Sequence, residues 1–90
     1  MYYIMLDQIL IEVVATAIFI FVVFLTKHYA WIGLITAIII YVSNGKSMFN
    51  PAIAVMNYVN GTYSLLTMGW LILAELVGAL IGFQLYRMVK

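Results

Sequence analysis

The sequence has no cysteine, one histidine and few charged residues. Without cysteine the chain can form neither a disulfide framework nor a thiolate metal site, and His28 cannot build a metal cluster alone. It contains no nucleophile–base pair and no phosphate-binding loop, so we expect no enzymatic activity, no catalytic residue, no metal and no cofactor. The four Lys and Arg residues are scattered and the net charge is +1, so nucleic acid is not an expected partner.

The composition is strongly apolar. Hydrophobic residues make up 68% of the 90 residues, charged residues 8%, and the mean hydropathy is +1.18. This leaves too little polar surface to cover a water-soluble domain. We therefore expect a multi-pass integral membrane protein with lipid as a partner. The N-terminal residues lack the basic region of a signal peptide, so we expect the first helix to remain in the mature protein.

Three long apolar runs predict three membrane-spanning helices. The first covers residues 8–26, ~28 Å of helix, which matches the thickness of a bilayer core. The second covers residues 30–43 and is somewhat short, and the third covers residues 64–89. The predicted fold is all-α, with the whole chain, residues 1–90, as a single unit.

Residues 44–59 are predicted to be a loop followed by a short re-entrant helix. Asn50 suits the N-cap of a helix, and Pro51 suits its first position, where a missing N–H loses no hydrogen bond. The apolar segment after them is too short to span a bilayer. Irregular backbone at membrane depth is tolerated where protein buries it or where it lines a water-filled cavity, so a re-entrant segment predicts one of these settings.

Small residues mark the expected helix-packing positions. Gly78 and Gly82 have the small-xxx-small spacing that lets another helix approach closely, and Gly33 with Ala37 offers a similar strip on the second helix. We expect tight packing at these positions, either among the helices of one chain or between chains.

The whole chain resembles one of the two repeats of the aquaporin (major intrinsic protein) family. Three features in the same order and spacing carry the resemblance. They are Glu12-Val13-Val14-Ala15-Thr16, Phe49-Asn50-Pro51-Ala52, and Ala74-Glu75-Leu76-Val77-Gly78-Ala79 followed by Leu85-Tyr86-Arg87.

The resemblance implies a passive channel for water or small uncharged solutes such as glycerol. Asn50, Pro51, Ala52 and Ile53 would line the pore, with the Asn50 amide donating a hydrogen bond to the passing molecule. The positive end of the half-helix dipole would oppose cations. Glu12 and Glu75 would brace the loop that leads into the half-helix.

The sequence departs from the family pattern at several positions. Ile53 stands where the second repeat of the family usually has the arginine of its selectivity filter, which implies a wider and less polar constriction. Lys46 and Met48 replace the common Gly and His. Glu75 replaces a Gln, and this second intramembrane carboxylate needs a partner: Ser47, a backbone amide or a proton.

A chain with one repeat implies a pore made of two inverted copies. The positive-inside rule allows insertion in both orientations where the charge bias is small. Lys27, Arg87 and Lys90 would lie on one side and Lys46 on the other, which is a modest bias. Family precedent implies an assembly of four pores.

Other interpretations of the same residues stay open. Asn50-Pro51-Ala52 also suits an ordinary helix start in a membrane loop, and Glu12 could snorkel to the headgroups. An intramembrane Glu could serve a small dual-topology, proton-coupled exporter. The chain could also be a non-conducting accessory subunit of another membrane protein.

Overall fold

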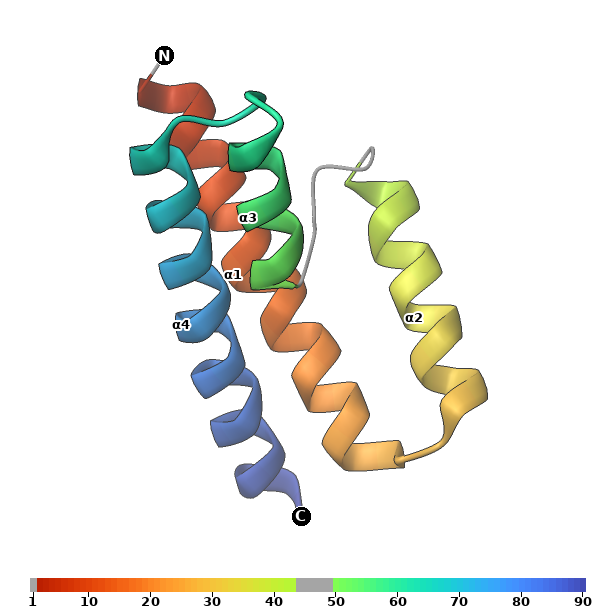
Figure 1. The fold of residues 1–90 in the computed structure, drawn as a ribbon. Helices are drawn as coiled ribbons and strands as arrows, with labels where there is room; N and C mark the ends of the chain where they lie inside the picture. The colour runs from red at the N-terminus through yellow and green to blue at the C-terminus, as the bar shows by residue number, and fades with distance from the viewer. Residues whose placement is uncertain (1, 44–49) are drawn as a thin grey trace.

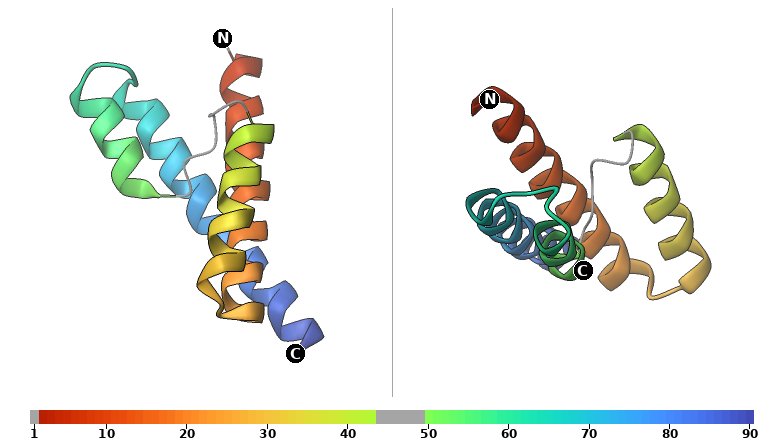
Figure 2. Two further views of the ribbon diagram at one scale, coloured as in Figure 1. Left: turned by 90° about the vertical axis from the view of Figure 1, so that its right-hand side faces the viewer. Right: turned by 45° about the horizontal axis from the view of Figure 1, so that its top comes forward.

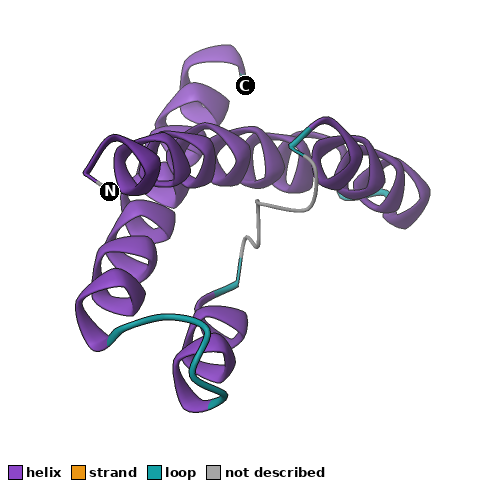
Figure 3. Cartoon of the chain, turned by 90° about the horizontal axis from the view of Figure 1, so that it is seen from above, coloured by secondary structure: helices purple, strands orange, loops and turns teal. Residues whose placement is uncertain are grey.

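A computed structural model describes the backbone of residues 2–43 and 50–90 and the side chains of residues 6–43 and 50–90. Across these residues the chain is helical and contains no strand (Figures 1 and 3). The loop predicted before Asn50, with Lys46, Ser47, Met48 and Phe49, lies outside the described residues.

The four helices are α1 (Tyr2–Thr26), α2 (Tyr29–Val42), α3 (Pro51–Val59) and α4 (Leu65–Val89). The predicted start of the first helix at residue 8 is wrong, because α1 already begins at Tyr2. Asp7 does not stop the helix because its side chain is exposed, where a polar residue loses no solvation. α2 begins and ends one residue before the prediction, at Tyr29 and Val42, and α4 begins one residue after it, at Leu65. His28, Ser43 and Ser64 are the cap residues at these three ends.

Two helices are long and apolar enough to cross a membrane. Their apolar stretches are Leu6–Thr26 and Leu65–Val89, whereas α2 has 14 residues and is shorter. Exposed large apolar side chains occur on all four helices, for example Leu80 (70% exposed) and Val59 (66% exposed). Helices that are apolar on their outer faces suit lipid or a protein partner better than water.

The helices pack as a central pair with two attached helices. α1 and α4 form the central contact, α2 contacts α1, and α3 contacts α4. Figure 3, which views the molecule from above, shows α4 crossing α1 with α2 and α3 on different sides of this pair. α2 contacts α1 along one face. None of its residues is buried within the described chain, so its other faces are exposed.

The start of α3 lies near the middle of the molecule. α3 begins at about half the height of α1 and α4 and runs toward the end of the molecule where the N-terminus lies (Figures 1 and 2). The chain then turns and α4 runs back along the full height. Ala54 of α3 and Leu71 of α4 are fully buried against each other and anchor this short helix.

The turn between α3 and α4 is held by side-chain caps. Gly61 has a φ of +89°, which favours glycine, and Asn60 Oδ1 accepts hydrogen bonds from Thr62 N at 3.0 Å and Thr62 Oγ1 at 2.7 Å. Ser64 Oγ then caps α4 by accepting from Thr67 N at 3.1 Å. These local bonds fix the reversal that places α3 beside α4.

We expect Ser64→Ala to lower the free energy of unfolding by about 1 kcal/mol, because the first turn of α4 loses its N-cap. Unfolding of the variant and the wild type in detergent micelles, followed by circular dichroism, measures this difference. Thr36→Val is the matched control. It removes a hydroxyl that bonds to Ile32 O inside α2, where the backbone already has its own helical partners. A loss for Ser64→Ala no larger than for the control would contradict the capping role.

Candidate functional site: the start of α3 and the buried polar cluster

Asn50 caps α3 in a way that fixes the orientation of its amide. Its backbone is extended, and its Oδ1 accepts a hydrogen bond from Ala52 N at 2.9 Å, while Pro51 occupies the first helical position. The capping bond uses the oxygen of the amide. The Nδ2 group of the exposed Asn50 is thereby left as a donor, and the Asn50 side chain has no other hydrogen-bond partner among the described residues.

The other predicted pore residues lie beside Asn50 and are also exposed. Pro51, Ala52 and Ile53 occupy the first turn of α3, and Ile53 is 45% exposed. Pro51 has no N–H, and the N–H groups of Ala52 and Ile53 donate to Asn50 Oδ1 and Asn50 O at 2.9 and 3.0 Å. This positive end of the helix therefore presents the Asn50 amide donor and the apolar Ile53 side chain to its surroundings. It can bind a hydrogen-bond acceptor or a partial negative charge.

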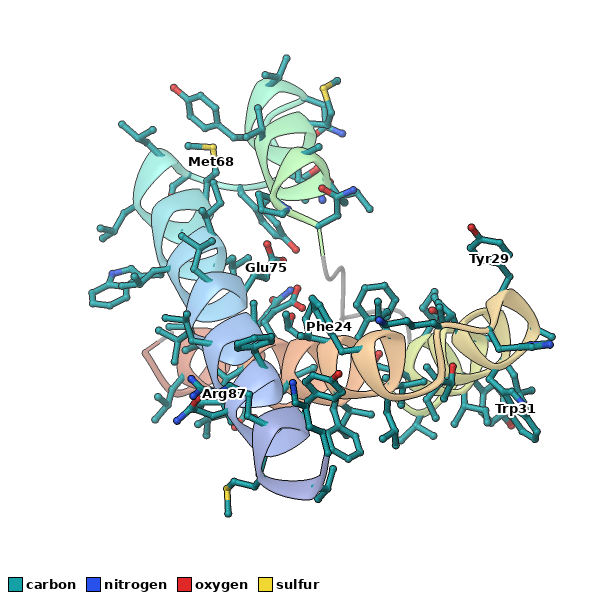
Figure 4. The ribbon with its side chains drawn as sticks, turned by 90° about the horizontal axis from the view of Figure 1, so that it is seen from below. Phe24, Tyr29, Trp31, Met68, Glu75 and Arg87 are labelled. Atoms are coloured by element: carbon teal, nitrogen blue, oxygen red, sulfur yellow. The ribbon has the colours of Figure 1, made fainter. Side chains whose placement is uncertain are left out.

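The predicted bracing residues Glu12 and Glu75 come together at the interface of α1 and α4. Glu12 is fully buried and Glu75 is 2% exposed, and the two carboxylates are close enough for their charges to interact. In Figure 4 Glu75 points from α4 toward α1 and the start of α3. Burial of Glu12 excludes the snorkelling interpretation for this residue. The loop that both residues were predicted to brace lies outside the described residues.

Thr16 belongs to the same cluster. It lies one helical turn after Glu12, is 3% exposed, and its Oγ1 is buried with no hydrogen-bond partner in the described part of the chain. Sequence reasoning did not assign Thr16 to the site. The signal was present in the spacing of four residues from Glu12, which places both side chains on one face of α1.

Glycines bring the two helices of this cluster close together. A Cβ atom added at Gly78 would lie 2.5 Å from Val13 O and 2.9 Å from Thr16 Cβ, and one added at Gly82 would clash with Ala17 O. Gly33 behaves differently, because a Cβ there would meet no described atom within 4 Å. Gly33 therefore does not pack against another helix within the described chain. Its packing against a second chain stays a prediction.

The interior of the helix pair is more polar than its outer surface. Two carboxylates and a threonine hydroxyl lie among the buried residues, whereas leucine, isoleucine and valine dominate the outside. Buried ionisable groups in a membrane-type helix pair are costly and typically mark a functional site.

Comparisons with protein-family models, curated proteins and solved structures find no match. No group of three or more His, Cys, Asp or Glu side chains that could hold a metal occurs within the described residues.

Proposed function

We propose that the chain is one repeat of an aquaporin-type channel, in which two inverted copies form a pore for water or small uncharged solutes. α1, α2 and α4 would cross the membrane, and α3 would be the re-entrant half-helix. Each copy would contribute Asn50 to the middle of the pore.

The observation that carries this proposal is the short helix that begins at mid-height with an asparagine cap. α3 has 9 residues, ~13 Å of helix, and cannot cross a bilayer. Its N-terminal end, with the Asn50 amide donor, lies near half the height of the long helices (Figure 1). A donor group and a positive helix end at the bilayer midplane favour neutral molecules with a hydrogen-bond acceptor and oppose cations.

Glu12 supports the proposal as a bracing residue. A buried carboxylate can accept hydrogen bonds from backbone N–H groups that lipid cannot solvate. Ile53, in the first turn of α3, would stand where the second repeat of the aquaporin family usually has the arginine of its selectivity filter. The constriction would then be wider and less polar, so glycerol-sized solutes would pass together with water.

Osmotic shrinkage of proteoliposomes that contain only this protein tests the proposal. We expect stopped-flow light scattering to show faster shrinkage than in empty liposomes, for water and for glycerol. Protease accessibility of tags at either end of the chain would show whether both orientations are present. Rates equal to empty liposomes, with folded protein inserted in both orientations, would exclude the channel.

The buried carboxylates favour a proton-coupled exporter as the second candidate. In that case a pH gradient would drive uptake of a cationic dye into the proteoliposomes, and Glu75→Gln would abolish it. A channel would show osmotic permeability without a gradient and no driven uptake, so the two assays separate the candidates.

A further inference from the structure

We propose that Glu12, Thr16 and Glu75 form a binding site for one monovalent cation, a proton or Na⁺. This inference depends on the cluster between α1 and α4 and does not require that the chain form a pore.

Glu75 provides the first reason. Its side chain is 2% exposed, and neither of its carboxylate oxygens has a hydrogen-bond partner among the described residues. Across the interface it meets Glu12, which would repel it if both were ionised. A buried carboxylate that faces a second carboxyl group is strongly unfavourable when ionised, so a positive charge on or next to Glu75 would remove this penalty.

Thr16 provides the second, independent reason. Its Oγ1 is buried and lacks a partner among the described residues, and its Cβ lies beside Gly78, one turn from Glu75 on α4. A hydroxyl in this position can accept a hydrogen bond from a protonated carboxyl or supply an oxygen ligand to Na⁺. Three buried oxygen-bearing side chains from two helices thus lie within about one helical turn of one another, at an interface whose other buried residues are apolar.

The described basic residues lie too far away to neutralise the pair. Along α1, Glu12 is followed by no charged residue until Lys27, which is ~22 Å further along the helix, and Arg87 is ~18 Å from Glu75 along α4. Asp7 lies on the exposed first part of α1. On α3, which also packs against α4, Tyr58 is the one titratable residue and is exposed. A mobile cation is therefore the fitting counter-charge.

Thermal unfolding of the full chain in neutral detergent micelles tests the proposal. One series varies pH in choline chloride, and the other replaces choline chloride by NaCl at constant ionic strength and constant pH. If the site binds a proton, Tm should rise by on the order of 5 °C as the pH is lowered. If it binds Na⁺, Tm should rise by a similar amount as NaCl replaces choline chloride.

Variants connect the shift to the cluster. Glu75→Gln keeps the shape of the side chain without its charge, so its Tm should no longer depend on the cation, and Thr16→Val should reduce the dependence. Asp7→Asn is the matched control because it neutralises an exposed acid of α1 and should leave the dependence unchanged.

Two results would overturn the proposal. The first is a wild-type Tm that depends on neither pH nor Na⁺, and this measurement requires no variant. If Lys46→Met then destabilised the protein, Lys46 would be the counter-charge. The second is a dependence on the cation that persists in Glu75→Gln. Loss of osmotic permeability alone would bear on the channel and leave this site unaffected.

Discussion

Proteoliposomes containing Asn50→Asp should show a water permeability at least about tenfold below that of the wild type, equivalent to a barrier higher by about 1.4 kcal/mol. The Asp side chain keeps an oxygen that can accept from Ala52 N, as Asn50 Oδ1 does, so α3 should still begin at Pro51. It loses the Nδ2 donor and places a negative charge at the positive end of the helix. Stopped-flow light scattering measures the change.

Asn60→Asp is the matched control for this variant. Asn60 lies at the opposite end of α3, and its Oδ1 also acts as an acceptor, in this case for Thr62. The substitution makes the same change of an amide to a carboxylate without touching the proposed pore. We expect the permeability of Asn60→Asp to equal that of the wild type. Equal permeability of Asn50→Asp and Asn60→Asp would show that the start of α3 does not line the pathway.

Replacing Gly78 and Gly82 together by alanine should lower the free energy of unfolding by about 3 kcal/mol. Alanine favours a helix over glycine by about 1 kcal/mol per residue, so propensity alone would stabilise α4. The new methyl groups, however, would press on the carbonyl oxygens of Val13 and Ala17, and backbone atoms cannot move aside as a flexible side chain can. Unfolding by SDS in mixed micelles measures the difference.

Gly69→Ala is the control that isolates the contact from the propensity. Gly69 lies on the same helix, and a Cβ there meets no described atom within 4 Å. This variant should be as stable as the wild type or up to about 1 kcal/mol more stable. If the Gly78 and Gly82 variant were also stabilised, the close approach of α1 and α4 would be wrong.

The local features of the fold could be predicted from the sequence. Asn50 followed by Pro51 indicates a helix start by its capping chemistry alone, and Asn60-Gly61 indicates the turn after it, because both signals depend on neighbouring residues. The predicted start of α1 at residue 8 is too late because Asp7 interrupts the apolar run. An apolar run indicates which part of a helix lies in a nonpolar environment. The helix itself can extend beyond that run, so the run does not define the ends of the helix.

Contacts between distant residues were harder to predict. The spacing of Gly78 and Gly82 shows that a close approach is possible, and the structure puts α1 there. Gly33 has the same kind of spacing with Ala37, yet a Cβ at Gly33 would meet no described atom within 4 Å. The spacing of small residues therefore does not specify which helix packs against them. Likewise Glu12 and Glu75 were each recognised as intramembrane acids, but their meeting depends on how α1 crosses α4.

The unequal helix lengths have a consequence for the surrounding lipid. α1 and α4, with 25 residues each, reach ~37 Å, whereas the 14 residues of α2 reach ~21 Å, short of a ~30 Å hydrocarbon core. In the membrane arrangement proposed above, α1 and α4 would exceed the thickness of the bilayer core and α2 would fall short of it. Lipid beside α2 would have to thin, at a fraction of a kcal/mol for each Å of mismatch. In that arrangement the mismatch would be relieved where protein replaces lipid around α2, and contacts between copies along α2 would then be favoured.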